Sequence, residues 1–249
     1  SDQRWLSPDE LILSFSTEPG LGFHAAGSYS KVLDIDRCYL MQEPANQIRL
    51  AIKEFALHNR YSFYNPKAQT GFLRSLIIRA TTTRQFMLIL IVAENNIDNI
   101  NDILNFTISR FPLLTSVYYV VNTKANDTVY DLEHVLFHGE RHIIEELNAI
   151  KYLIGPKSFF QTNRFGATQL FEKAKKMANL KGDVIVYDLY CGVGSISLFL
   201  ADSVKKVIGI ETVSEAIDFA KKNAILNKIS NATFYSGDVN YVFNNELID

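Results

Sequence analysis

The chain has 249 residues, of which 47% are hydrophobic and 21% charged, and its formal net charge is −2. This length allows one large or two smaller domains with buried cores, and the near-neutral charge disfavours a nucleic-acid-binding surface spread over the whole chain. No apolar run is long enough to span a membrane, no signal peptide is visible, and two cysteines provide no disulfide framework, so we expect a cytoplasmic protein without a membrane partner.

The first part of the chain combines short strands with a helix. The predicted strands are residues 11–15, 22–24 and 32–35, and a turn is predicted at 19–22. A helix is expected from Glu43 to Asn59 because apolar residues recur there at helical spacing. The residues of its apolar face are Ala45, Ile48, Ala51, Ile52 and Phe55.

Two long strands follow, and their nearly continuous apolar runs place at least one of them in the centre of a sheet. The predicted strands are 72–82, 85–93 and 116–122, with a hairpin turn at Thr83-Arg84 and a helix at 97–111. A second hairpin is predicted to join 135–137 to 142–144 around His138-Gly139-Glu140. Because strands cluster around two helices, residues 1–157 are interpreted as one α+β domain.

After Pro156 the pattern changes to strict alternation of strands and helices. Thr162 or Asn163 can cap a helix that reaches Leu180 and stops at Gly182, with an apolar side that includes Leu170, Phe171 and Met177. The elements expected next are residues 183–190, 195–202, 206–211, 213–226 and 232–236. This alternation predicts right-handed crossovers and a parallel sheet, so residues 158–249 are interpreted as α/β. Three strands are about half of a doubly wound domain, and we therefore expect a fragment.

The stretch from Val184 to Ser195 predicts the functional centre. Its first half is expected to be a parallel strand covered on both faces. Gly192 and Gly194 allow a tight turn and a close approach of backbone to a ligand. The helix that begins at Ser195 would then direct free N–H groups at that ligand.

Two carboxylates are predicted at the same edge of the sheet. Glu211 ends the second parallel strand and can accept hydrogen bonds from a ribose diol, and Asp238 follows the third strand, where it can accept one from an adenine amino group. Asp238 can equally be a solvated acid at a strand end. A dinucleotide site needs small residues near the pyrophosphate, whereas Asp188, Tyr190 and Cys191 crowd this turn.

Several motifs resemble known families. Asp188-x-Tyr190-x-Gly192-x-Gly194 resembles motif I of class I, Rossmann-like S-adenosylmethionine-dependent methyltransferases. A closer resemblance, in chain order, is to the RNA uracil-5 methyltransferase family. The segments that carry it are Gly22-Phe23-His24, Asp36-Arg37-Cys38, Leu73-Arg74-Ser75, Phe159-Phe160-Gln161-Thr162-Asn163 and the stretch 188–194. The resemblance implies an α+β central domain followed by the first half of the methyltransferase domain. It also implies a cofactor site that contains Gln161, Asp188, Tyr190, Gly192, Gly194, Ser195, Glu211 and Asp238, although Gln161 can also be a polar helix-entry residue.

The family chemistry needs a cysteine thiolate that adds to uracil C6 and a carboxylate that removes the C5 proton. In the family both follow the fourth strand, so no catalytic residue is expected in this chain and the fragment is expected to be inactive. Cys191 is interpreted as a small residue packed in the turn. Cys38 resembles the last ligand of an iron–sulfur site in some relatives, but one ligand of four cannot hold a cluster.

The chain offers a few other charged or ligating residues. Arg74, Arg79 and Arg84 are the candidates for an RNA-facing patch, whereas Lys173, Lys175 and Lys176 are expected on a solvated helix face. His134, His138 and His142 have the spacing of a helical metal site, but Gly139 and the neighbouring β-branched residues favour a hairpin, so no metal is expected.

The sequence therefore predicts a fragment of an RNA uracil-5 methyltransferase that uses S-adenosylmethionine and acts on ribosomal or transfer RNA. Two alternatives stay open: a dinucleotide (NAD(P))-dependent oxidoreductase, and a non-catalytic RNA-binding module with the same fold. Because the first parallel strand would lack a neighbour, we also expect self-association, or coverage of its edge by the tail from Val239 to Asp249.

Overall fold

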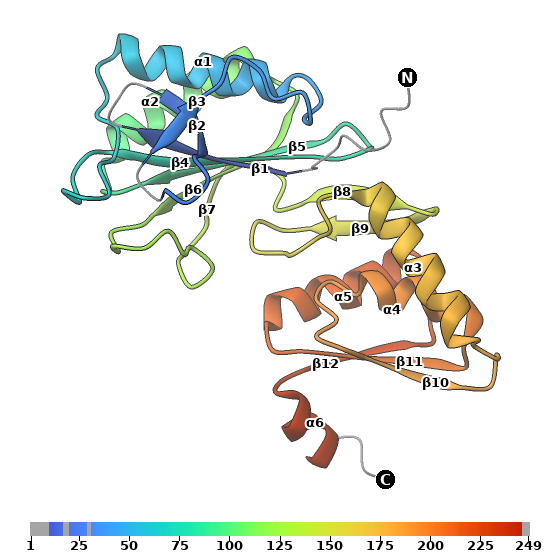
Figure 1. Cartoon of the computed structure of the whole chain (residues 1–249). Coiled ribbons are helices and arrows are strands. Elements are labelled where there is room, and N and C mark those ends of the chain that lie inside the picture. Colours follow the sequence, from blue (N-terminus) through green and yellow to red (C-terminus); the bar gives the residue numbers. More distant parts are fainter. Residues whose placement is uncertain (1–9, 17–19, 29–30, 246–249) are drawn as a thin grey trace. The chain divides into compact units, whose positions relative to one another are not determined.

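The computed structural model describes residues 10–16, 20–28 and 31–245 (Figure 1). The chain forms two compact units, residues 1–143 and 144–249, which are described separately below. The sequence pattern placed the boundary at residue 157 instead. The difference is the hairpin of β8 (Ile143–Leu147) and β9 (Ile150–Ile154), which belongs with the second unit because β9 is hydrogen-bonded to α5 (Ser214–Leu226) of that unit.

The first unit is built on a seven-stranded sheet of order β3-β2-β1-β4-β5-β6-β7. Its strands are β1 (Glu10–Ser16), β2 (Gly20–His24), β3 (Val32–Asp34), β4 (Leu73–Ala80), β5 (Phe86–Val92), β6 (Leu114–Val121) and β7 (Val135–Gly139). The pair β5–β6 is parallel because α2 (Ile97–Arg110) crosses between them, and the other pairs are antiparallel. Figure 1 shows α2 and α1 (Ala45–His58) on one face of this sheet.

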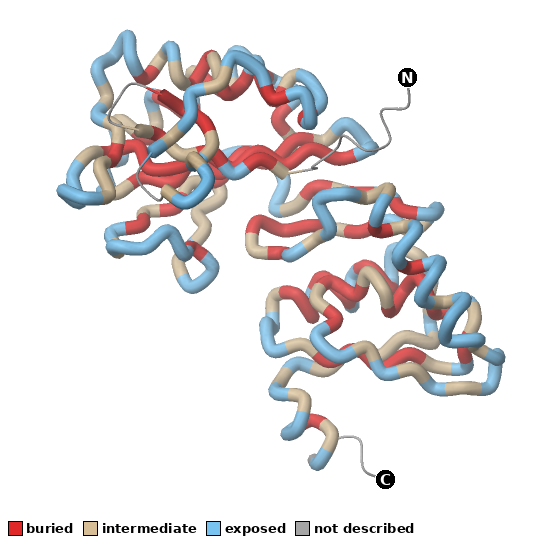
Figure 2. Tube along the Cα trace, viewed as in Figure 1, coloured by how far each residue is buried: buried red, intermediate tan, exposed pale blue. Residues whose placement is uncertain are grey.

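The central strands of the first unit agree with the sequence. Every residue of β4 and β5 is buried, which confirms the prediction that at least one of the two long apolar runs lies centrally. The main core lies between the sheet and the two helices, and Figure 2 shows the central strands of the sheet buried. Ile48 and Ile52 of α1 and Ile103 of α2 are fully buried in this core. The predicted turn at 19–22 was wrong in part, because β2 begins at Gly20.

The predicted hairpin between 135–137 and 142–144 was wrong. β7 pairs with β6 instead, because the free edge of β6 accepts it in antiparallel register, with Tyr119 opposite Val135. β8 turns back onto β9 through Asn148 and Ala149, whose φ angles are 50° and 63°. Two left-handed residues are typical of a type I′ hairpin turn, but Asn-Ala lacks the glycine that would have revealed it in the sequence.

The second unit contains a parallel sheet of order β10-β11-β12, as predicted. Its strands are β10 (Ile185–Leu189), β11 (Lys206–Glu211) and β12 (Ala232–Ser236). Its helices are α3 (Arg164–Ala178), α4 (Ser195–Leu200), α5 (Ser214–Leu226) and α6 (Val239–Asn245), with a short 3-10 turn η2 (Ala201–Ser203) after α4. Figure 1 shows α4 and α5 on one face of the sheet and α6 on the other. The candidate site lies at the carboxyl ends of these three strands.

The expectation that β10 is covered on both faces was wrong. Val186 packs against the cluster around Phe171 and Phe199, but Tyr187 on the opposite face is 42% exposed. Helix α6 approaches that face, with the Phe243 ring 5.0 Å from the Tyr187 ring. The described part of the tail, Val239–Asn245, therefore forms a helix beneath the sheet and not a strand along its edge, while residues 246–249 lie outside the described residues. Self-association through β10 stays a prediction.

Helix α3 differs from its prediction at its end and on its apolar side. Asn163 caps its start by accepting from Gly166 N at 2.8 Å, as predicted. The helix ends before Asn179, a left-handed cap with φ 46°, and not at Gly182. Phe171 is buried, but Met177 is 76% exposed, so the predicted apolar side is covered only in part.

Candidate functional site

The turn between β10 and α4 has an unusual backbone. Tyr190, Gly192 and Gly194 all have positive φ angles, of 64°, 55° and 81°. The two glycines adopt this region without a steric penalty, whereas Tyr190 does so at a cost of about 1–2 kcal/mol. A Cβ at Gly194 would lie 3.0 Å from the Phe234 ring, so this position also requires a close approach. A turn of this kind persists only where its surroundings hold it in place.

Glu211 joins the end of β11 to this turn. One carboxylate oxygen accepts from Gly192 N at 3.2 Å, and the other accepts from Val213 N and Thr212 Oγ1, both at 3.0 Å. A carboxylate has about four acceptor sites, so these three bonds leave capacity for a further donor. The predicted proximity of Glu211 to the glycine turn is therefore present in the structure, and its negative charge lies beside the backbone N–H groups of the turn.

Asp188 contacts the helix that follows the turn. Its carboxylate accepts from Ser197 Oγ at 2.6 Å. Burial raises the pKa of Asp188, and the nearby charge of Glu211 raises it further, while the bond from Ser197 opposes both effects. Asp188 therefore braces the first turn of α4 from the end of β10.

Cys191 lies inside the turn as a small packed residue, as the sequence indicated. Its side chain is 6% exposed. Burial raises the pKa of the thiol, and the charges of Asp188 and Glu211 raise it further. The thiol is therefore protonated at neutral pH and is not an activated nucleophile.

The other predicted cofactor residues lie in different surroundings. Tyr190 is 70% exposed, and Ser195 is the first residue of α4. Asp238 is exposed, and its carboxylate accepts from Asn240 N and Tyr241 N at 2.9 and 3.2 Å, which caps α6. Gln161 is exposed in the segment before α3. The structure thus brings Gly192, Gly194, Ser195 and Glu211 together with Asp188, while Asp238 has a helix-capping role and Gln161 stays a prediction.

Sequence reasoning missed three polar residues behind the turn: Ser197, Asn223 and Tyr152. Ser197 and Asn223 are fully buried polar residues on helices, and Tyr152 is a fully buried residue of β9. The sequence signal for Asn223 was its position in the apolar stripe of α5, between Ala220 and Ala224. A polar amide in such a stripe indicates a buried hydrogen-bonding role.

The predicted RNA patch of three arginines was wrong for two of them. Arg74 is 3% exposed, and its guanidinium donates to three backbone carbonyl groups and to Asp127. Arg79 is 8% exposed and donates to Glu10 at 2.8 Å. Both arginines lie in the central strand β4, where charged side chains need internal partners. Arg84 is exposed in the turn between β4 and β5 and stays a prediction for RNA contact.

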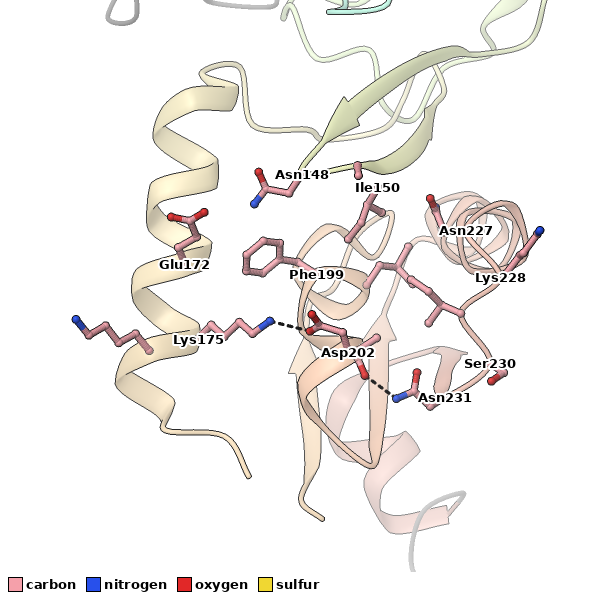
Figure 3. Close-up of a pocket in the computed structure, with 15 residues that line it drawn as sticks. Asn148, Ile150, Glu172, Lys175, Phe199, Asp202, Asn227, Lys228, Ser230 and Asn231 are labelled. Atoms are coloured by element: carbon pink, nitrogen blue, oxygen red, sulfur yellow. Dashed lines mark hydrogen bonds and ion pairs between the residues drawn. The ribbon is translucent and has the colours of Figure 1, made fainter. Parts of the chain in front are cut away.

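A pocket of about 820 Å³ lies elsewhere in the second unit (Figure 3). It is lined by α3, α4, the β8–β9 turn and the segment before β12, and Lys175 donates to Asp202 at 2.7 Å across its wall. Ser230 and Asn231 place this pocket at the amino end of β12. Ligands of open α/β sheets bind at the carboxyl ends of the strands, so the glycine turn is the candidate site and the pocket is not.

Neither a metal site nor a membrane span was found in the described part of the chain. Within residues 10–16, 20–28 and 31–245, no three His, Cys, Asp or Glu side chains are arranged to hold a metal. No helix in these ranges is long and apolar enough to cross a membrane. Cys38 is buried, and its backbone N–H and C=O are both bonded to the Asn46 side chain, at 2.8 and 3.0 Å.

Comparison with known proteins gives consistent matches. Residues 121–236 match the family model described as tRNA (Uracil-5-)-methyltransferase. A curated relative from Porphyromonas gingivalis is 43% identical over 256 residues, and one from Bacteroides thetaiotaomicron is 40% identical over 254 residues. Both are named uncharacterized RNA methyltransferases, and both alignments cover 100% of this chain. The chain spans about half the length of these relatives, 55% and 56%.

A solved structure of a tRNA methyltransferase resembles most of the chain. It is the crystal structure of Pyrococcus abyssi tRNA (uracil-54, C5)-methyltransferase in complex with S-adenosyl-L-homocysteine. The match has a TM-score of 0.75 and 29% sequence identity, and it covers 92% of this chain and 55% of that chain. The predicted combination of an α+β part with a Rossmann-like part is therefore confirmed.

Proposed function

This chain belongs to the family of RNA uracil-5 methyltransferases, and we propose on that basis that its second unit binds S-adenosylmethionine at the turn between β10 and α4. The observation that carries the proposal is the contact between Glu211 and Gly192 N, which places a carboxylate with spare acceptor capacity beside a two-glycine turn. The named ligand of the similar Pyrococcus abyssi structure, S-adenosyl-L-homocysteine, supports the same cofactor class.

The turn residues fit the parts of this cofactor. The Glu211 carboxylate is suited to accept a hydrogen bond from a hydroxyl of the ribose diol with the oxygen that binds Gly192 N, and the backbone of Gly192 and Gly194 allows close approach of the methionine end. Ser195 begins α4, whose free N–H groups favour a carboxylate. Tyr190 is exposed beside the turn, where its ring can cover the ligand. S-adenosylmethionine supplies the activated methyl group when it is bound.

Asp238 and Gln161 are proposed to contact the cofactor as well. Asp238 is proposed to accept from the adenine amino group with its second carboxylate oxygen, since the first caps α6. Gln161 is proposed to approach the cofactor from the segment before α3. Residues 158–249 would then form the first half of the methyltransferase domain, and residues 1–157 the central domain that precedes it.

For the whole protein we propose methylation of uridine C5 in RNA, ribosomal or transfer. The names of the relatives support RNA as the substrate class. Uracil C5 becomes nucleophilic when a thiolate adds to C6, and a base must later remove the C5 proton. We propose that both groups lie in the part of the relatives that this chain does not span, because neither of its two cysteines is suited to the task.

A calorimetric titration of the chain with S-adenosylhomocysteine tests the proposed cofactor. We expect saturable binding at one site and no binding of NAD at the same concentrations, because Asp188, Tyr190 and Cys191 crowd the space that a pyrophosphate needs. Binding of NAD in preference to S-adenosylhomocysteine would contradict the proposal and favour a dinucleotide-dependent oxidoreductase.

The 249-residue chain is expected to transfer no methyl group to RNA, even though it binds the cofactor. The reason is that Cys38 and Cys191 are both buried and the pKa of the Cys191 thiol is raised. Labelled S-adenosylmethionine and unmodified bulk RNA provide the measurement. Methyl transfer to uracil C5 by the native chain would refute the expectation, and the matched variant Cys191→Ala would then show whether Cys191 supplies the thiolate.

A further inference from the structure

The strained turn between β10 and α4 is held from behind by α5 and β9. Asn223 of α5 is fully buried, and both ends of its side-chain amide are used. Its Nδ2 donates to Val193 O at 3.1 Å, and its Oδ1 accepts from Leu153 N at 2.7 Å. One side chain therefore links the strand β9 to the peptide group that precedes Gly194.

Tyr152 makes a second link from the neighbouring position of β9. Its hydroxyl donates to Ser195 O at 3.1 Å, and its ring is fully buried. Burial raises the pKa of Tyr152 well above its ordinary value, so the hydroxyl keeps its proton at neutral pH. The two carbonyl groups that flank Gly194 are thus both fixed through β9. Val193 O is bonded by Asn223, which also binds β9, and Ser195 O is bonded by Tyr152 of β9 itself.

Fixing these carbonyl groups fixes the direction of the N–H groups in the same peptide planes. Each carbonyl lies in one rigid plane with the N–H of the next residue, which points the opposite way. The bonds to Val193 O and Ser195 O therefore set the orientation of the Gly194 and Ile196 N–H groups. The Gly194 N–H donates to Cys191 O at 2.9 Å and closes the turn, so its direction is part of the turn's own geometry. The Ile196 N–H belongs to the first turn of α4, where N–H groups lack helical acceptors and can bind a ligand or a cap.

We propose that Asn223 and Tyr152 are positioning residues for the cofactor turn, and that the β8–β9 hairpin sets cofactor affinity through them. The proposal rests on the assignment of the turn as the S-adenosylmethionine site. Neither side chain touches the cofactor in this account, because both act through the backbone carbonyl groups behind the turn. Strained backbone of this kind needs such over-determination to persist.

The chain contains a matched control for Asn223. Asn227 caps the carboxyl end of α5, four residues after Asn223, and also binds β9, with Nδ2 donating to Lys151 O at 2.6 Å and Oδ1 accepting from Lys151 N at 2.8 Å. Its described side-chain bonds reach only β9 and α5 itself. Asn227→Ala therefore removes an amide link between the same helix and strand without touching the turn.

The experiment compares Asn223→Asp, Tyr152→Phe and Asn227→Ala with the native chain. Asn223→Asp keeps the acceptor for Leu153 N but places a carboxylate against Val193 O, and Tyr152→Phe removes only a hydroxyl. We expect Asn223→Asp to weaken S-adenosylhomocysteine binding about tenfold and Tyr152→Phe about fivefold, the scale of one lost buried hydrogen bond. Asn227→Ala is expected to leave the affinity within about twofold, the range of surface changes.

Amide hydrogen exchange of the turn without cofactor provides the second readout. We expect faster exchange in residues 190–196 of Asn223→Asp and Tyr152→Phe, with unchanged exchange in β11 and β12. Equal exchange of the turn in all three variants and the native chain would overturn the inference, as would equal cofactor affinity. If the native chain bound no S-adenosylhomocysteine, the proposed function would fail, while turn exchange would still decide the role of Asn223 and Tyr152.

Discussion

Arg74→Ala is expected to destabilise the first unit by about 3–5 kcal/mol, because bonds from a buried guanidinium cost about 1.5–3 kcal/mol each to lose. The Arg74 side chain donates to Asn122 O at 2.7 Å and to Lys124 O at 2.6 Å, and it lies 4.2 Å from the centre of the Tyr64 ring. These contacts tie β4 to the segment that follows β6. Removing the side chain leaves carbonyl groups without a donor and opens a cavity in the centre of the sheet.

The control for this prediction is Arg84→Ala, the same chemical change at an exposed position of the neighbouring turn. It is expected to alter stability by no more than about 0.5 kcal/mol. Hydrogen exchange of the β4, β5 and β6 amides across a urea series measures the first unit directly, which avoids assuming that the two units unfold together. Equal midpoints for Arg74→Ala and Arg84→Ala would contradict the structural role and reopen an RNA-facing role for Arg74.

Glu211→Ala is expected to weaken binding of S-adenosylmethionine about tenfold or more, since bonds to a charged acceptor contribute about 1.5–3 kcal/mol. The variant loses the proposed bond to the ribose. It also loses the acceptor for Gly192 N and Val213 N, so the turn itself is less constrained. Calorimetry on the purified chain provides the measurement.

Asp218→Ala is the matched control for Glu211→Ala. It removes one negative charge from an exposed position of α5 and leaves the turn untouched. Its affinity for S-adenosylmethionine is expected to equal that of the native chain. If Glu211→Ala bound as tightly as this control while remaining folded, the ribose assignment would have to be withdrawn.

The sequence predicted the helices and strands of both units well because periodicity and turn residues are local signals. The runs in β4 and β5, the alternation from β10 to β12, and the pair of glycines all act within a few residues. What the sequence could not show was the choice of partner. β7 and β8 read as one hairpin, yet β7 completes the sheet of the first unit and β8 pairs with β9.

The sequence likewise predicted only part of the candidate site. Glu211 beside Gly192 was predictable because parallel strands align their carboxyl ends at one edge. Tyr152 and Asn223 were not, because they reach the turn across more than 25 residues, from a hairpin before it and a helix after it. The misassigned arginines have a related cause: Arg74 faces a carbonyl-lined loop that folds back from residues 122–127, which no local pattern reveals.

The most direct test of the central claim is a titration of the glycine-labelled chain with S-adenosylmethionine, observed by NMR. The chain has 12 glycines, so the spectrum is simple, and Gly27 and Gly71 of the first unit serve as internal references. We expect saturable shifts of the Gly192 and Gly194 amide signals, with the references unchanged and no response to NAD. Saturating S-adenosylmethionine that left Gly192 and Gly194 unmoved would contradict the central claim.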